Sequence, residues 1–440
     1  MSGALEIFWQ MSARDYGEVA SDAFAGREQQ AVNRSGRQKI SAPRISHEAE
    51  RTRNPRCLLG IKMSQVAIKR CKDYNTENMQ RAVEEAVGLL GGIEKFVKLG
   101  QKVLIKPNLL SPRPPEHGVC THPEVIRAVI RLVKKVTQDI SVGDSHGGFE
   151  VISMDNVYEV SGMKAVCAEE GVKLVKFDTA VNIDGIPFAK AVKDADVIIN
   201  VPKMKTHGLL ILTGAVKNMF GAVIGKHKAE AHFKHIARQD FASYIIKIFM
   251  HVKPVLSIMD GIVAMEGDGP AAGSLRNAEL ILASDDAVAM DVVFSELAGV
   301  TPESLLTTYY AGKMGLGTSS LSGIKISGEA LRDVRLKDFK LPKASFIYDA
   351  PRWVIKIFGR SVRTYPFIKV DACVKCRICE KNCPAEAINI DKNEIDYSKC
   401  IFCFCCHELC PHNAIGVRKS LAGKIAGFIL KVRQRKKNGD

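Results

Sequence analysis

Short apolar runs alternate with helical stretches between Val66 and about Gly328. The runs have the length and composition of buried strands and include VAIKRC, KVLIKPN, DISVGDS, VKLVKF, DVIINVPK, VLSIMDG and AELILAS. EVIRAVIRLVKKV and DDAVAMDVVFSELAGV instead repeat apolar residues at i, i+3, i+4 and i+7, which is typical of amphipathic helices. Strands separated by helices favour a mainly parallel sheet with helices on both faces. We therefore predict an α/β domain over residues 63–330.

Polar residues gather where these strands end. Ligands of such sheets bind at the carboxyl ends of the strands. Asp144 lies near the end of DISVGDS, where GDSHGG begins, Lys205 and His207 follow DVIINVPK, and Lys217 lies a few residues later in TGAVKNMFG. We predict that Asp144, Lys205, His207 and Lys217 contribute to a catalytic or binding site at this rim.

The lysines and the GDSHGG segment each allow two interpretations. Lys203, Lys205 and Lys217 either clamp a carboxylate or phosphate or form a solvated loop. The clamp is favoured because directional donors accompany them, namely Thr206, His207 and Asn218. GDSHGG can hold a phosphate on backbone N–H groups, but it lacks the Gly-Lys-Ser/Thr of a P-loop and the dinucleotide G-x-G-x-x-G. An ordinary tight turn is the favoured interpretation of that segment.

Carboxylates and histidines near the rim suggest two further roles. Asp144, Asp260, Glu266 and Asp268 are residue types that bind divalent metals, although aspartates at strand ends more often cap helices. His207 and His232 can exchange protons near neutral pH, although a lone histidine is more often a structural hydrogen-bonding group. No Ser-His-Asp elbow or nucleophilic cysteine signature is evident.

A cysteine repeat follows the α/β pattern. The segment from Cys373 to Ile415 holds nine of the chain's thirteen cysteines. Two runs share the spacing C-x2-C-x2-C-x3-C-P and are displaced by 27 residues: Cys373, Cys376, Cys379 and Cys383, then Cys400, Cys403, Cys406 and Cys410. Repetition of a whole unit is far harder to obtain by chance than one C-x-x-C pair.

This spacing predicts two [4Fe–4S] clusters, because each needs four thiolates and three closely spaced cysteines supply only three. In two-cluster ferredoxins the last cysteine of each run ligates the other cluster. The predicted ligand sets are therefore Cys373, Cys376, Cys379 and Cys410, and Cys400, Cys403, Cys406 and Cys383. Structural zinc sites are the alternative, but they usually separate two C-x-x-C pairs. Cys405 falls outside the repeat, and we interpret it as a neighbouring thiol.

Two known families share these motifs. Residues 367–417 resemble bacterial-type two-cluster ferredoxins, which implies one-electron transfer and an anaerobic or well-reduced setting. Residues 64–300, with KPN, VGDS, VPKMKTH, TGAVKNMFG, DGIVAMEGDGP and Ala289-Met290-Asp291, resemble domain-of-unknown-function family 362. Many members of that family carry the same ferredoxin pair at the C-terminus. The resemblance implies an architecture and leaves the reaction open.

The net charge of +15 lies mainly at the chain ends. Residues 418–440 hold eight basic residues against one acidic residue, and residues 1–62 hold ten against seven. The body has little surplus charge, so we do not expect nucleic acid as a partner. Apolar positions from Val417 to Val432 form one stripe of a basic amphipathic tail, which fits either an anionic membrane surface or packing on its own domain.

The remaining segments complete the predicted organisation. Residues 1–62 show neither helical nor strand periodicity, and we expect a disordered extension upstream of Met63. Residues 331–366 are interpreted as a linker. No run approaches the roughly 18 apolar residues of a membrane-spanning helix. A cytoplasmic protein, peripheral to the membrane if the tail binds lipid, is the expectation.

Three functional hypotheses follow from the sequence. The leading one is an iron–sulfur oxidoreductase whose ferredoxin domain passes single electrons to or from the α/β rim, with a redox protein or a small-molecule acceptor as partner. The second is a non-catalytic electron carrier that docks a partner protein through its larger domain. In the third, the clusters only hold the C-terminal region together.

Overall fold

The computed structural model describes residues 63–147, 152–235, 237–342 and 364–420. The expectations for residues 1–62, for linker residues 343–363 and for tail residues 421–440 fall outside this part of the chain. Within it, no helix combines the length and apolar character needed to cross a membrane.

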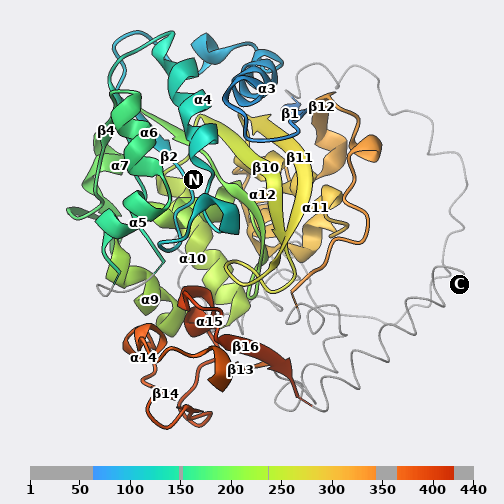
Figure 1. Ribbon diagram of the computed structural model, residues 1–440. Helices are drawn as coiled ribbons and strands as arrows, with labels where there is room; N and C mark the ends of the chain where they lie inside the picture. Colours follow the sequence, from blue (N-terminus) through green and yellow to red (C-terminus); the bar gives the residue numbers. More distant parts are fainter. Residues whose placement is uncertain (1–62, 148–151, 236, 343–363, 421–440) are drawn as a thin grey trace, which may run out of the picture. The chain divides into compact units, whose positions relative to one another are not determined.

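A mixed sheet of ten strands forms the centre of the larger domain (Figure 1). Its main strand order is β12 (Ile324–Gly328), β1 (Ser64–Arg70), β11 (Ser274–Ser284), β10 (Leu256–Glu266), β7 (Val197–Asn200), β2 (Val103–Lys106), β3 (Ile140–Val142) and β4 (Lys173–Leu174). Most neighbouring strands are parallel, whereas β11 runs antiparallel to both β1 and β10. All seven strand-like runs recognised in the sequence lie in this sheet.

Helices cover both faces of the sheet, as predicted (Figure 1). One face packs against α3 (Thr76–Gly88), α4 (Pro123–Lys134), α5 (Met154–Val160) and α6 (Met163–Glu169). The other packs against α8 (Ala215–Asn218), α10 (Arg238–His251), α11 (Ala287–Leu297) and α12 (Leu306–Lys313). Alternation along β2 shows why: Val103 and Ile105 enter the first core, and Leu104 enters the second. The α/β fold class is thereby confirmed.

Smaller elements complete the domain. They are the hairpin of β5 (Ala180–Ile183) and β6 (Ile186–Ala189), and the helices α7 (Lys190–Asp194) and α9 (Gly225–Lys234). Residues 331–342, which lie at the start of the segment interpreted as a linker, pack on this domain. Val334, Leu336 and Phe339 are buried in its second core, and the Gly267 N–H donates to the Lys340 carbonyl at 2.6 Å.

The segment after β7 forms a strand, although a solvated loop was one interpretation of its lysines. Val201 and Pro202 interrupt the backbone, because proline has no N–H for the sheet ladder. The chain then continues as β8 (Lys203–His207), which pairs with β10 in parallel and with β9 (Ile211–Thr213) in antiparallel. Lys203, Lys205 and His207 consequently lie on one face of β8, since side chains alternate along a strand.

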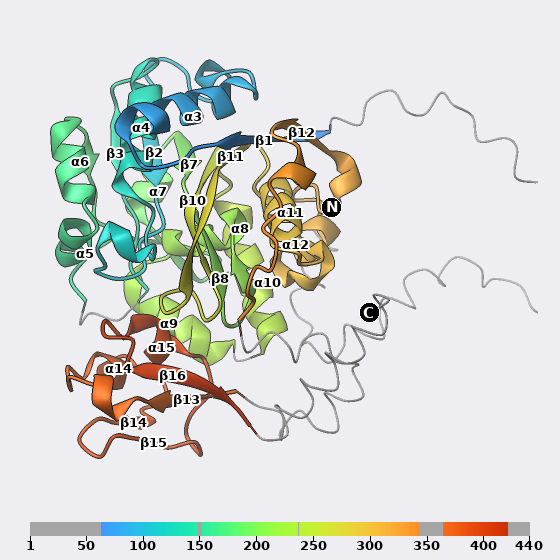
Figure 2. The ribbon, with the colours of Figure 1, turned by 45° about the vertical axis from the view of Figure 1, so that its right-hand side comes forward.

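A cysteine-rich module follows from Thr364. Its β13 (Thr364–Ile368) pairs antiparallel with β16 (Ile415–Lys419), as Figure 2 shows. Between them lie α14 (Ile378–Lys381), β14 (Ile388–Asn389), β15 (Glu394–Ile395) and α15 (Cys405–Leu409). A small core of isoleucines packs with Cys379, Cys406 and Cys410. The predicted small α+β module is therefore present.

Gly221 permits a close approach beneath the rim. It lies in the 3-10 turn Met219–Ala222, and a Cβ atom there would overlap the Asp144 carboxylate and the Lys106 ammonium group. These two groups form a buried ion pair with an N–O distance of 2.7 Å. Glycine is therefore required by packing at this position.

We predict that Gly221→Ala lowers the free energy of unfolding by about 1–3 kcal/mol, as other overpacked interiors do. Gly88→Ala is the matched control, because a Cβ atom there meets nothing within 4 Å and alanine favours the helix that Gly88 ends. Chemical denaturation of the anaerobically purified variants measures both changes. Equal stability of the two variants would contradict the assigned packing.

Candidate functional site

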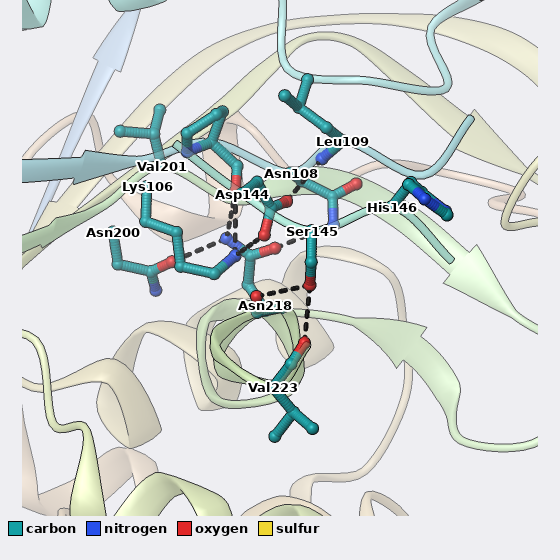
Figure 3. A network of polar contacts seen from close by, with 12 residues as sticks. Lys106, Asn108, Leu109, Asp144, Ser145, His146, Asn200, Val201, Asn218 and Val223 are labelled. Carbon is teal, nitrogen blue, oxygen red and sulfur yellow. Dashed lines mark hydrogen bonds and ion pairs between the residues drawn. The ribbon is translucent and has the colours of Figure 1, made fainter. Parts of the chain in front are cut away.

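The ion pair of Lys106 and Asp144 lies at the carboxyl ends of β2 and β3 (Figure 3). Lys106 also donates to the Pro107 carbonyl at 3.1 Å, and Asp144 accepts the Leu109 N–H at 2.8 Å. Burial lowers the pKa of Lys106, and the Asp144 carboxylate opposes that shift. Asp144, predicted as a site residue, thus holds Lys106 and the following loop in place.

Three asparagines connect the motifs at this rim (Figure 3). Asn108 donates to Asn218 at 2.8 Å, and Asn218 donates to Asn200 at 2.7 Å. Asn200 in turn donates to the Ala215 carbonyl at 3.0 Å. KPN, the end of β7 and TGAVKNMFG are therefore joined by one amide network.

The described residues of GDSHGG form hydrogen bonds with neighbouring loops of the domain. The Ser145 hydroxyl lies 2.7 Å from both the Gly221 and the Val223 carbonyls, and the Gly147 N–H donates to the Leu110 carbonyl at 2.8 Å. Residues 148–151 lie outside the described residues. These contacts favour the tight-turn interpretation of residues 143–147.

Asp291, the last residue of the Ala289-Met290-Asp291 motif, holds the start of a helix at the rim. Its carboxylate accepts the N–H groups of Ala215 at 2.6 Å and Val216 at 3.1 Å, and so fixes the start of α8, which carries Lys217. Burial raises the pKa of Asp291 to about 7, whereas the two backbone donors lower it. A Cβ atom on Gly214 would overlap this carboxylate.

Lys203 is not available to clamp a ligand, so the predicted three-lysine clamp requires correction. Its ammonium group lies 2.7 Å from the Asp260 carboxylate and 2.8 Å from the Tyr74 hydroxyl. Tyr74 donates to Asp260 at 2.9 Å and stacks on His122 with ring centroids 3.6 Å apart. Neither Tyr74 nor His122 lies in a motif that would have indicated this role.

The carboxylates considered for a divalent metal have other partners. Asp144 and Asp260 each pair with a buried lysine. Glu266 lies 3.6 Å from Arg276 and 3.4 Å from Lys340. In the described ranges, no group of three or more His, Cys, Asp or Glu side chains is arranged to hold a metal ion. The divalent-metal interpretation therefore gains no support.

Lys205 and His207 lie side by side along β8. Lys205 is 1% exposed, donates to the Val119 carbonyl at 2.6 Å and lies opposite Thr213 in the β8–β9 register. Burial lowers the pKa of Lys205 to about 7. His207 Nδ1 accepts the N–H groups of Leu209 and Leu210, and its Nε2 lies 3.4 Å from the Glu408 carboxylate.

Lys217 and Lys228 enlarge this cationic region. Burial lowers the pKa of Lys217, although the nearby Glu408 opposes the shift. Lys228 donates to the Ser145 carbonyl at 2.6 Å and to the His146 carbonyl at 2.8 Å, and burial lowers its pKa to about 7. Lys228 was not predicted, because it lies in a helix with no motif around it. The side chain of His232 lies outside the described residues.

The second cysteine loop packs directly on this rim. Arg113 donates to the Pro411 carbonyl at 2.5 Å, to the Cys410 carbonyl and to the Asn413 side chain at 3.3 Å. The His407 Nε2 atom lies 3.1 Å from the Asp268 carbonyl. Leu409 is buried in the core formed by α3 to α6. Arg113 and Glu408 were missed because contacts between distant segments leave no local pattern.

The two cysteine loops share one backbone conformation. Residues with positive φ recur at the 27-residue displacement in three pairs, Lys375 and Phe402, Arg377 and Phe404, and Glu386 and Asn413. The Ala387 N–H donates to Cys383 Sγ at 3.3 Å, and the Ala414 N–H donates to Cys410 Sγ at 3.2 Å. The same backbone-to-sulfur hydrogen bond therefore recurs in both loops.

The neighbours of individual thiols follow the crosswise pattern. The pKa of Cys379 is raised to about 12, chiefly by burial, with contributions from the nearby Cys410, Cys376 and Cys373. Burial also raises the pKa of Cys406, with further contributions from a second set of thiols, chiefly Cys403, Cys383 and Cys400. These neighbours therefore divide the eight thiols of the repeat into two sets of four.

An α/β domain with a cationic rim, joined to a module of two equivalent cysteine loops, defines a class of iron–sulfur proteins. Residues 103–296 match the family model described as domain of unknown function (DUF362), and residues 365–411 match that of a 4Fe-4S dicluster domain. Thylakoid-associated protein sll1697 of Synechocystis sp. is 32% identical over 287 residues, which cover 63% of this chain and 88% of that protein. The chain belongs to the DUF362 family and carries a C-terminal 4Fe-4S dicluster domain.

A more distant likeness exists among solved structures. The lactate racemase apoprotein from Thermoanaerobacterium thermosaccharolyticum matches 54% of this chain at 11% identity with a TM-score of 0.32. The match spans 56% of that structure, about half its length. It carries no argument about function.

We predict that Arg113→Gln loosens the contact between the second cysteine loop and the rim, because the loop carbonyls lose a charged donor. Amide hydrogen exchange should increase in residues 405–413 and in β8. Arg127→Gln is the control, because Arg127 on α4 pairs instead with Glu124, Glu169 and Glu170 of the larger domain. Unchanged exchange in residues 405–413 of the Arg113 variant would contradict the docking role.

Proposed function

We propose that this protein binds two [4Fe–4S] clusters and exchanges single electrons between them and a site on the α/β rim formed by Lys205, His207 and Lys217. The observation that supports this most is the contact between the second cysteine loop and that rim, where Glu408 lies 3.4 Å from His207. The dicluster domain match supports iron–sulfur electron transfer in general. The proposed oxidoreductase role goes further than that match.

The proposed ligands are the two crosswise sets of the repeat. One set is Cys373, Cys376, Cys379 and Cys410, and the other is Cys400, Cys403, Cys406 and Cys383. When bound, the clusters supply one-electron chemistry. Cys405 is buried beside Cys403 and belongs to neither set.

The chain's own residues hold the module and the rim together. Arg113 fixes the backbone of Cys410 and Pro411, and Leu409 removes its apolar side chain from water in the core of the larger domain. His207 keeps one ring nitrogen engaged by backbone N–H groups and directs the other at Glu408. The arrangement places the second cysteine loop against the rim lysines.

A peripheral membrane location accompanies this proposal. The name of the Synechocystis relative describes it as thylakoid-associated. In this chain the basic residues of 418–440 are the proposed contact with anionic lipid. Co-sedimentation with phosphatidylglycerol vesicles, compared with phosphatidylcholine vesicles, tests this. Equal binding to both, or binding that survives removal of residues 421–440, would refute it.

We predict that anaerobically purified protein holds about eight irons and eight sulfides and shows paired signals in EPR after reduction. Cys376→Ser should lose the spectrum of one cluster, because one iron loses its thiolate. Cys405→Ser is the matched control, since it changes a buried thiol in the same module and should retain the full iron content. Zinc in place of iron, or equal iron loss in both variants, would contradict the assignment.

The electron-transfer part has its own readout. Reduced protein is mixed anaerobically with small carboxylates or phosphate esters, and the visible absorbance of the clusters is followed. Reoxidation by one compound that is slowed in Lys217→Met supports transfer at the rim. If every compound reoxidises the wild type and the variant at the same rate, the clusters still transfer electrons, but the rim has no part in that transfer.

A further inference from the structure

The rim carries more positive than negative charge, on the buried Lys106, Lys205 and Lys228 and on the half-buried Lys217. Lys217 lies within electrostatic range of three further lysines, namely Lys106, Lys205 and Lys228. The carboxylates that act on them are Asp144 and Glu408. If all six groups are ionised, two positive charges remain uncompensated. Burying such a surplus is costly unless an anion accompanies it.

Several donors of these lysines remain unused by the described residues. Lys106 contacts Asp144 and the Pro107 carbonyl, and Lys228 contacts two carbonyls, which leaves one N–H group on each. Lys205 donates to the Val119 carbonyl and makes no second hydrogen bond to a described residue. No hydrogen bond joins Lys217 to a described residue. The free donors are therefore concentrated on Lys205 and Lys217.

Buried polar atoms without partners lie in the same region. Thr213 is 2% exposed, and its hydroxyl makes no hydrogen bond to the described residues, although it lies directly opposite Lys205 in the β8–β9 register. The Arg113 Nε and Ser111 hydroxyl atoms are likewise buried and unpartnered. Buried polar groups normally find partners, so such a group of exceptions requires an explanation.

We infer that Lys205, Lys217 and Thr213 bind an oxyanion, the carboxylate or phosphate group of a small molecule. An oxyanion supplies several acceptor atoms and negative charge together, which matches both the unused donors and the charge surplus. The site rests on the proposed function, because the oxyanion is the recognised group of the molecule that reacts at the rim. Side chains bind the oxyanion in this site, since the chain has no P-loop sequence that would bind it through backbone N–H groups.

The site adjoins the second cysteine loop. Glu408 and Cys405 both act electrostatically on Lys217, and Glu408 also acts on Lys205. Glu408 is held by His207, so one carboxylate from the module already faces the lysines. An oxyanion bound here lies on the side of the α/β domain that the module covers.

Isothermal titration calorimetry of the anaerobic protein with both clusters bound tests this inference at low ionic strength. The probes are inorganic phosphate and oxalate, and chloride controls for ionic strength. We expect binding of at least one probe, with Lys205→Met and Lys217→Met each weakening it about tenfold or more. Thr213→Val, which keeps the side-chain shape, should weaken it by a smaller factor.

Lys325→Met is the matched control, because Lys325 is exposed on the edge strand β12. Circular dichroism and iron content establish that each variant is folded. Binding by neither probe, or binding equal in the wild type and both rim lysine variants, overturns the inference.

The outcomes separate this site from the proposed function. One outcome is that probe binding requires Lys205 and Lys217, but the clusters never exchange electrons with a rim ligand. That outcome supports the oxyanion site and contradicts the proposed redox role. Reducible clusters without binding of either probe remove the site. Preference for phosphate or for oxalate identifies the oxyanion.

Discussion

A buried ammonium group at the end of a β-strand must be compensated, and this requirement organises the rim. Desolvation of an unpaired charge costs several kcal/mol. Lys106 is compensated by Asp144 and Lys203 by Asp260, each at 2.7 Å. The first pair requires glycine at position 221, where a Cβ atom would overlap both groups. Compensation of these charges thus determines which residues can occupy the neighbouring motifs.

The same requirement separates lysines that the sequence could not distinguish. Lys203 and Lys205 lie two residues apart on one face of β8, in chemically similar positions. Asp260 lies opposite Lys203 in the β10 register, whereas Met265 lies opposite Lys205. Only tertiary pairing reveals that Lys203 is structural and that Lys205 retains unused donors.

Much of the fold was predictable because its signals are local. Apolar runs marked seven strands of the sheet, namely β1, β2, β3, β4, β7, β10 and β11. The periodicity of α4 and α11 marked two of the helices that cover it. The cysteine spacing indicated two equivalent loops, and the positive φ values of Lys375 and Phe402 show the equivalence in the backbone. β8 escaped notice because its Lys-Met-Lys-Thr-His sequence is polar yet fully buried.

The contact between module and rim was not predictable. Arg113 and Glu408 lie far apart in sequence, and each acts on a partner contributed by the other domain. The two cysteine loops, equal in backbone, differ in surroundings: Cys376 is exposed and its counterpart Cys403 is half-buried, and Cys383 is half-buried whereas its counterpart Cys410 is buried. This difference comes from docking, which no repeat in the sequence encodes.

In the proposed function, the clusters and the cationic rim form one working unit. Phosphorus NMR of phosphate bound to the anaerobic protein tests it most directly, because reduced clusters are paramagnetic and accelerate relaxation of nearby nuclei. The account predicts faster phosphate relaxation after reduction, and loss of that effect in Lys217→Met. Relaxation that is identical in the oxidised and reduced protein would contradict it.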